Sequence, residues 1–177
     1  MLKKIIIVLS FALIIGGVGY LYQTVPMQKD IRMVQMINNE GEQIGIVKLS
    51  ETKTGMLLAL NVSGLTPNGE HAFHIHETSD CSPFKTFKNA GDHFKPENRS
   101  KEHSTWKMPT LLPNAKGVIK AQVLNRGVTL NPEDTEDGRK TIFDDDNSAL
   151  VIHARADDHM DHHSSGAGER IACGEIK

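Results

Sequence analysis

The sequence of 177 residues has little of what several classes of protein require. Aromatic residues make up only 5% of it, there are only two cysteines, and the net charge of −2 provides no strongly basic surface for a nucleic acid. No segment has the long apolar periodicity of an amphipathic helix. These absences argue against a helical bundle and a nucleic-acid-binding protein. Fifteen glycines and seven prolines instead favour a fold with many turns.

Short apolar segments rich in Val, Ile, Leu and Met indicate β-structure. Turn residues separate the first three, which predicts a meander of hairpins. Long polar connections lie between the later segments, and long loops in a compact β domain are usually functional or disordered. The sequence therefore predicts an all-β Greek-key barrel or sandwich with large loops. The expected strands are residues 31–37, 43–49, 55–62, 71–77, 117–124, 149–155 and 170–176.

The N-terminus has a different composition from the rest of the chain. Lys3 and Lys4 precede an apolar run that ends at Tyr22, and this run would be about 27 Å long as a helix. We expect residues 1–22 to be a signal or membrane-anchor segment, residues 23–30 a linker, and residues 31–177 one exported domain. Cleavage and retention both remain open, because no clear small-x-small cleavage site follows the run. No cysteine for a lipid anchor follows it either.

Cys81 and Cys173 are far apart in the sequence. In an oxidising compartment such a pair favours one disulfide. The alternative is two buried free thiols.

Histidine is the residue type in excess. Six of the nine histidines fall in two short stretches, 71–76 and 159–163, which is typical of metal binding or of a polar loop. His74 and His76 would leave one face of a strand together, which suits a metal ion. His93 and His153 are candidates for further ligands.

Four motifs resemble those of the copper/zinc superoxide dismutases, and they occur in that family's order. They are His71-Ala72-Phe73-His74-Ile75-His76-Glu77, Ala90-Gly91-Asp92-His93-Phe94-Lys95-Pro96, Val151-Ile152-His153 with Asp157-Asp158, and the segment from Gly166 to Ile176. The resemblance covers roughly residues 31–176. It implies the Greek-key fold of that family and the conversion of superoxide to dioxygen and hydrogen peroxide at copper, in an exported protein of bacterial type.

The resemblance also implies individual roles. Arg170 would attract the superoxide anion, and Asp157 would link a copper ligand to a zinc ligand. His71 matches a histidine that pins a loop. The expected copper ligands are His74, His76, His93 and His153, with His93 bridging to zinc, and the expected disulfide joins Cys81 and Cys173. Such a protein would act in the periplasm or on the outer face of the cytoplasmic membrane, held to that membrane if the N-terminal segment is uncleaved. The sequence leaves its oligomeric state open.

The zinc site departs from the family pattern. His93 and His103 match two of the four usual ligands, but Ser104 and Lys107 stand where a histidine and an aspartate belong. Three interpretations stay open. The protein could be a copper-only enzyme, it could be a copper-binding or copper-delivery protein without activity, or a histidine-rich loop could supply the missing zinc ligands. That loop contains His159, His162 and His163.

Overall fold

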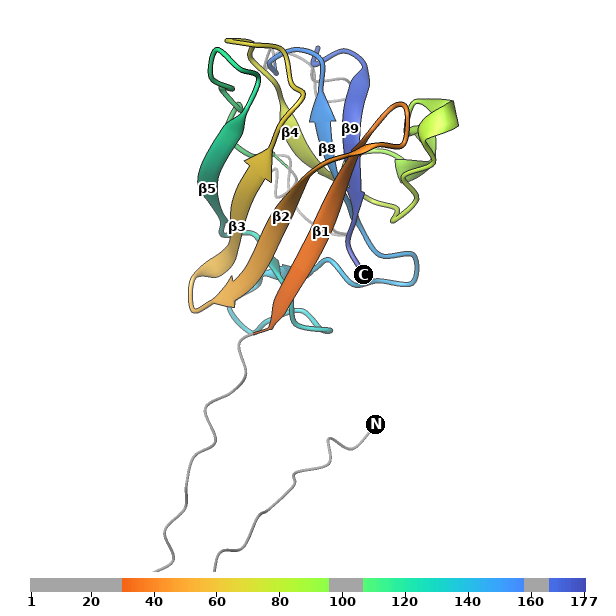
Figure 1. Ribbon diagram of the computed structural model, residues 1–177. Helices are drawn as coiled ribbons and strands as arrows, with labels where there is room; N and C mark the ends of the chain where they lie inside the picture. The colour runs from red at the N-terminus through yellow and green to blue at the C-terminus, as the bar shows by residue number, and fades with distance from the viewer. Residues whose placement is uncertain (1–29, 96–106, 158–165) are drawn as a thin grey trace, which may run out of the picture.

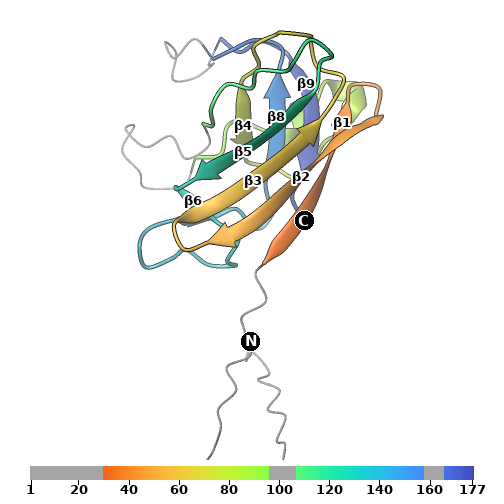
Figure 2. The ribbon, with the colours of Figure 1, turned by 60° about the vertical axis from the view of Figure 1, so that its left-hand side comes forward.

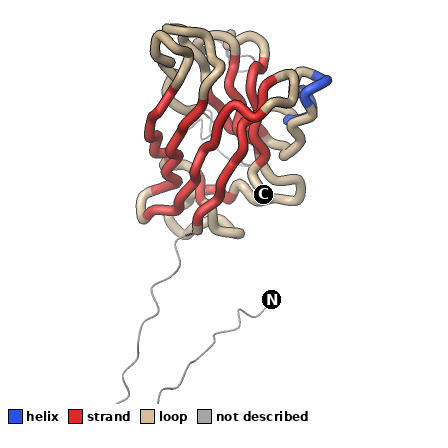
Figure 3. The backbone as a smooth tube through the Cα atoms, viewed as in Figure 1, coloured by secondary structure: helices blue, strands red, loops and turns tan. Residues whose placement is uncertain are grey.

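The structure is a computed structural model that describes residues 30–95, 107–157 and 166–177. The predicted all-β class is confirmed, because the described residues contain strands and only two single-turn 3-10 helices, Pro83–Lys85 and Lys88–Ala90 (Figure 3). The strands are β1 (Ile31–Asn38), β2 (Gln43–Thr52), β3 (Gly55–Val62), β4 (Phe73–His76), β5 (Ile119–Asn125), β6 (Val128–Thr129), β7 (Lys140–Thr141), β8 (Ala149–His153) and β9 (Arg170–Glu175).

The expectations for the N-terminus concern residues that the structure leaves undescribed. The segment 1–22 and all but Asp30 of the linker lie outside the described residues. Among the residues that are described, no helix has the length and apolar character needed to cross a membrane.

Seven strands form one sheet in the order β4-β8-β9-β1-β2-β3-β5. β1, β2 and β3 follow one another as antiparallel hairpins, and β9 returns from the end of the chain to pair with β1, which is the Greek-key order. The sheet curls, so that β4, β8 and β9 lie behind β1, β2, β3 and β5 (Figures 1 and 2). The two halves of one sheet therefore face each other across a shared core.

Alternation along the strands builds this core. Val34 and Met36 of β1 and Val47 and Leu49 of β2 are at most 1% exposed, while residues between them point to solvent. One face of each strand thus packs inside the curled sheet, as period-2 patterning requires.

β4 and β8 differ from the front strands because both of their faces are buried. Phe73 and Ile75 pack in the main core, with Leu150 and Ile152 of β8 paired beside them. The opposite face of this pair is covered by the connection that follows β4. A second apolar cluster lies under that cover and consists of Cys81, Phe87, Ala90, Ala149, Val151 and Cys173.

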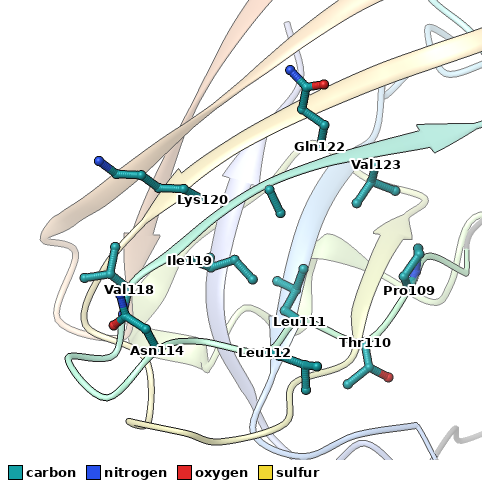
Figure 4. Close-up of a pocket in the computed structure, with 11 residues that line it drawn as sticks. Pro109, Thr110, Leu111, Leu112, Asn114, Val118, Ile119, Lys120, Gln122 and Val123 are labelled. Carbon is teal, nitrogen blue, oxygen red and sulfur yellow. The ribbon is translucent and has the colours of Figure 1, made fainter.

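The chain runs beside β4 again before it enters β5. Lys107 forms a β-bridge with His74, and Leu111 forms one with His71. Backbone bonds from Met108 to Phe73 (3.2 Å) and between Leu111 and His71 hold the segment 107–111 against this edge of the sheet. A surface pocket opens between this segment and β5, lined in part by Leu111 and Val123 (Figure 4). None of the four candidate histidine ligands lines that pocket.

The connection 125–147 is one of the long polar connections that the sequence predicted, and it contains the two-residue strands β6 and β7, which pair in parallel. Arg139 forms an ion pair with Glu51 at the end of β2, and the Glu51 carboxylate also accepts a 2.7 Å bond from the Leu130 backbone N–H. The charged residues of this connection therefore anchor it to the sheet.

Candidate metal centre

Two of the predicted ligands come from the short strand β4. His74 and His76 are two residues apart, so their side chains leave the strand on the same face, the one turned away from the main core. Phe73 and Ile75 alternate with them and are buried in that core. Both histidines are 0% exposed. The apolar residues thus fix the strand, and the strand sets the spacing of the two imidazoles.

The other two predicted ligands come from the connection after β4 and from the end of β8. His93 forms a β-bridge with His76, which brings the connection back across β4. His153 is the last residue of β8 and lies opposite Arg170 of β9. One ring nitrogen from each of His74, His76, His93 and His153 lies within 4.8 Å of the others, and all four residues are buried. The fold thus assembles all four predicted copper ligands in one place.

Backbone carbonyls determine which nitrogen of His76 and of His153 faces this centre. Nδ1 of His76 lies 3.0 Å from the Gly91 carbonyl oxygen, and Nδ1 of His153 lies 3.2 Å from that of Gly168. A carbonyl oxygen only accepts, so each Nδ1 donates and carries the proton. The two Nε2 atoms keep their lone pairs and lie 3.3 Å apart. Their facing lone pairs repel each other, and a cation bound by both would relieve this.

The four imidazoles are held in the neutral form. Burial, together with neighbouring positive charge, lowers the pKa of His74 and of His76 to about 2. Burial also lowers the pKa of His93 and of His153 to about 4. Neutral imidazole is the form that binds a metal, and copper is the divalent ion with the highest affinity for such nitrogen sites. The donor set therefore fits a copper ion.

Sequence reasoning assigned no role to the two glycines that orient these ligands. Gly91 has φ +73° and Gly168 has φ +76°, a region that favours glycine. A Cβ on Gly91 would also lie 2.6 Å from Cγ of Glu77. Both glycines lie within motifs that the sequence analysis singled out. Their position close to the histidine ligands was therefore the feature of the sequence that could have indicated this orienting role.

Arg170 is fixed beside the histidines by backbone carbonyls. Its guanidinium donates to the carbonyl oxygen of Phe87 at 2.7 Å and to that of Gly91 at 2.6 Å. The same Gly91 oxygen accepts from His76, so the cation and a ligand share one anchor. Burial lowers the pKa of Arg170, and Asp92 and Glu77 act against that change. An arginine still remains charged in a protein, so a fixed positive charge lies at the centre.

The predicted disulfide is confirmed, and the described residues contain no free cysteine. Cys81 and Cys173 are bonded across 92 positions of the chain, with their Cα atoms 5.6 Å apart. The bond ties the connection after β4 to β9. The Cys81 backbone N–H also donates to the Glu175 carboxylate at 3.1 Å. Because Phe87 and Gly91 belong to this connection, the disulfide helps to hold the carbonyls that position Arg170.

His71 lies apart from the four-histidine group. Its Nδ1 is 2.7 Å from the backbone carbonyl of His153, and the residue is buried. This contact ties the start of the β4 segment to the end of β8, which agrees with the pinning role that the resemblance implied.

Asp157 lies next to His74, near the ring nitrogen Nε2. One of its oxygens, Oδ2, is 3.4 Å from Nε2 of His74 and 3.0 Å from Nζ of Lys107. The Asp157 side chain is 4% exposed, so its charge is almost entirely shielded from water. The resemblance implied a link from a copper ligand to a zinc ligand, and the structure places the ammonium of Lys107 at the far end of that link.

The described residues do not assemble a second metal site. Within residues 30–95, 107–157 and 166–177, the four-histidine group is the only set of three or more metal-binding side chains close together. The ammonium of Lys107 would repel a divalent cation beside Asp157. The described side chains therefore do not fit zinc. The predicted zinc ligand His103 lies outside the described residues, as do Ser104, His159, His162 and His163.

Comparisons with known proteins agree on one family. The family described as "Copper/zinc superoxide dismutase (SODC)" matches residues 43–176. The chain is 42% identical to "Superoxide dismutase [Cu-Zn] 2" of Aquifex aeolicus (strain VF5) over 151 residues, which cover 81% of this chain and 84% of the relative. It is 35% identical to "Superoxide dismutase [Cu-Zn]" of Caulobacter vibrioides over 78% of this chain and 80% of that protein.

A solved structure gives the same result. The crystal structure of a SOD-like protein from Bacillus subtilis superposes with a TM-score of 0.72 at 28% identity, covering 82% of this chain and 97% of that one. The resemblance inferred from the four motifs is thereby confirmed. The chain belongs to the copper/zinc superoxide dismutase family.

Proposed function

We propose that the protein is a copper-dependent superoxide dismutase. The observation that carries the proposal is the buried group of His74, His76, His93 and His153, whose ring nitrogens converge within 4.8 Å beside the charged Arg170. When bound there, copper supplies one-electron redox chemistry that takes an electron from one superoxide, releasing dioxygen, and gives it to a second, which leaves with two protons as hydrogen peroxide.

The chain's own residues would bring the substrate to this centre. Superoxide is a small anion, and the guanidinium of Arg170 offers it a positive charge that two carbonyls hold in place. A fixed cation next to the site raises the rate of encounter and favours binding of the anion. The charge needs no rearrangement when the substrate arrives, because Phe87 and Gly91 already orient it.

We assign proton transfer to His93. It is the most exposed of the four histidines, at 9%, against 0% for His74 and His76 and 5% for His153. An imidazole has two nitrogens, so His93 can hold the metal through one of them and carry an exchangeable proton on the other. The resemblance to the family supports the same role, because it matches His93 to the ligand that bridges the two metals.

We further propose that the enzyme acts outside the cytoplasm, with residues 1–22 directing export and residues 31–177 forming the catalytic domain. Two observations support this. Lysines precede the apolar N-terminal run, as in exported proteins. The domain also contains a disulfide, which persists in oxidising compartments.

The test is the catalysed decay of superoxide, followed by stopped-flow absorbance with the full chain purified in mild detergent. Metal-free protein should be inactive, and activity should rise with added copper until one ion is bound per chain. Tight copper binding without activity would contradict the proposal and would leave a copper-binding or copper-delivery protein on this fold.

A further inference from the structure

A positive charge, the ammonium of Lys107, lies close to Nε2 of His74 through Asp157. Lys107 is not a flexible surface lysine at this point, because its backbone forms a β-bridge with His74. The next residue, Met108, donates to the Phe73 carbonyl and is buried. The origin of the lysine side chain is therefore fixed to the same strand as the ligand.

A single carboxylate oxygen lies between the ammonium and the imidazole. Oδ2 of Asp157 is 3.0 Å from Nζ of Lys107 and 3.4 Å from Nε2 of His74. The exposed fractions of the three side chains are 27% for Lys107, 4% for Asp157 and 1% for His74. Water therefore screens these charges little, and the buried carboxylate requires a counter-charge close by.

This chain of contacts has a consequence for His74. A carboxylate oxygen 3.4 Å from Nε2 of His74 electrostatically favours the tautomer that carries its proton on Nε2, which leaves the lone pair of Nδ1 for a metal. A partner that fixes the carboxylate therefore also fixes the tautomer and the orientation of the ligand. Lys107 provides that partner from within the chain.

We propose that Lys107 is a built-in cation that replaces the second metal of this family. Resting on the proposed copper site, it holds Asp157 in the orientation that presents His74 to copper, and its charge excludes a divalent cation from the space beside Asp157. The protein then takes one copper ion per chain and no zinc. Lys107 acts through Asp157 and is a positioning residue.

The first part of the test counts metals. Metal-free full-length protein is loaded with copper, with zinc, or with both, freed of unbound ions and analysed by mass spectrometry, while the Cu(II) electron paramagnetic resonance spectrum is recorded. We expect one copper per chain, no zinc in addition to it, and a copper spectrum that added zinc does not change. One zinc per chain beside copper, with an altered copper spectrum, would overturn the proposal.

The second part removes the charge. Lys107→Met keeps much of the side-chain length without the ammonium, and Lys107→Arg keeps the charge. We expect Lys107→Met to alter the copper spectrum and to weaken copper binding by about 10- to 100-fold, the usual effect of losing such a supporting partner. Lys107→Arg should restore the wild-type spectrum. The matched control is Lys120→Met, at an exposed position on β5, and it should behave as wild type.

If Lys107→Met has the copper spectrum and the copper affinity of the wild type, the positioning role of Lys107 is overturned. If that variant does not fold, the comparison of Lys107→Arg with wild type and the zinc competition on wild type still decide the question. Superoxide decay, measured in parallel, separates the two proposals. Copper binding that depends on Lys107 but gives no catalysis would contradict the enzyme and not the lysine, whereas catalysis that requires zinc would contradict the lysine and not the enzyme.

Discussion

His74 has two sets of neighbours, and they differ in charge. The first set is three more neutral imidazoles, held by strands and carbonyls, whose lone pairs converge. In the second set a carboxylate lies between the ring and an ammonium. The first set is short of a cation, and the second already contains one. Under our proposal for Lys107, the family's two-metal arrangement is reduced to a single metal site with an internal counter-charge.

Removing one ligand from the four-histidine group should have the largest effect on copper affinity and activity. His76→Ala leaves three imidazoles and deletes the Nε2 that faces His153, so copper affinity should fall by at least about 100-fold and activity with it. Calorimetric titration of copper and superoxide decay measure the two effects. An intact circular dichroism spectrum shows that the fold survives. Activity close to wild type would contradict the four-histidine assignment.

Substitution of Arg170 tests whether the positive charge beside the four histidines attracts the substrate and does not contribute to metal binding. In Arg170→Met, we expect kcat/KM for superoxide to fall about tenfold, with one copper still bound per chain. The dependence of the rate on ionic strength should also become weaker, because the attraction of the anion is lost. Arg170→Lys keeps the charge but loses the two-carbonyl geometry, and it should lie between the two. Unchanged salt dependence in Arg170→Met would argue against this role.

Reduction of the disulfide tests the cover over the copper side. The bond closes 92 positions of chain, so its loss should cost about 2–5 kcal/mol of the free energy of unfolding and lower the melting temperature clearly. Activity should fall as well, because the Arg170 anchors lie on the connection that the bond tethers. Calorimetry before and after verified reduction measures the change. An unchanged melting temperature would refute the structural role of Cys81 and Cys173.

The pH dependence of stability should show the neutral state of the imidazoles. Histidine has an ordinary pKa near 6.5, and in the folded protein the values fall to about 2 and about 4. Below pH 6.5 the unfolded chain therefore binds protons that the folded chain does not, so the metal-free protein should lose stability as the pH falls from 7 to 4.5. Denaturant unfolding at several pH values measures this, and His76→Gln should reduce the slope by about one proton. A flat profile would contradict the pKa shifts.

Much of the fold and of the four-histidine site could be predicted from the sequence, for physical reasons. Local alternation determines which residues share a strand face, so residues 55–62 were predicted with the bounds that β3 has, and His74 and His76 were placed on one face. The strand expected over 71–77 is shorter, Phe73–His76, because the chain leaves the regular pairing with β8 at both ends: His71 forms a bridge with Leu111, and the Glu77 backbone N–H donates to Asp92. The four ligands and the disulfide followed from the family motifs.

Contacts between distant segments could not be predicted in this way. Nothing near Arg139 indicates that it pairs with Glu51, and so the order of the connection 125–147 was missed. Lys107 was recognised as a departure from the zinc pattern. Its ion pair with Asp157 depends on how the segment 107–111 docks on β4, which the local sequence does not encode.

The most direct test of the single-metal account is activity per bound copper in wild-type protein loaded with copper alone. We expect full superoxide dismutase activity at one copper and no zinc per chain, with no gain when zinc is added. Activity that appears only after zinc binds would contradict this expectation and would show that residues outside the described part of the chain complete a second metal site.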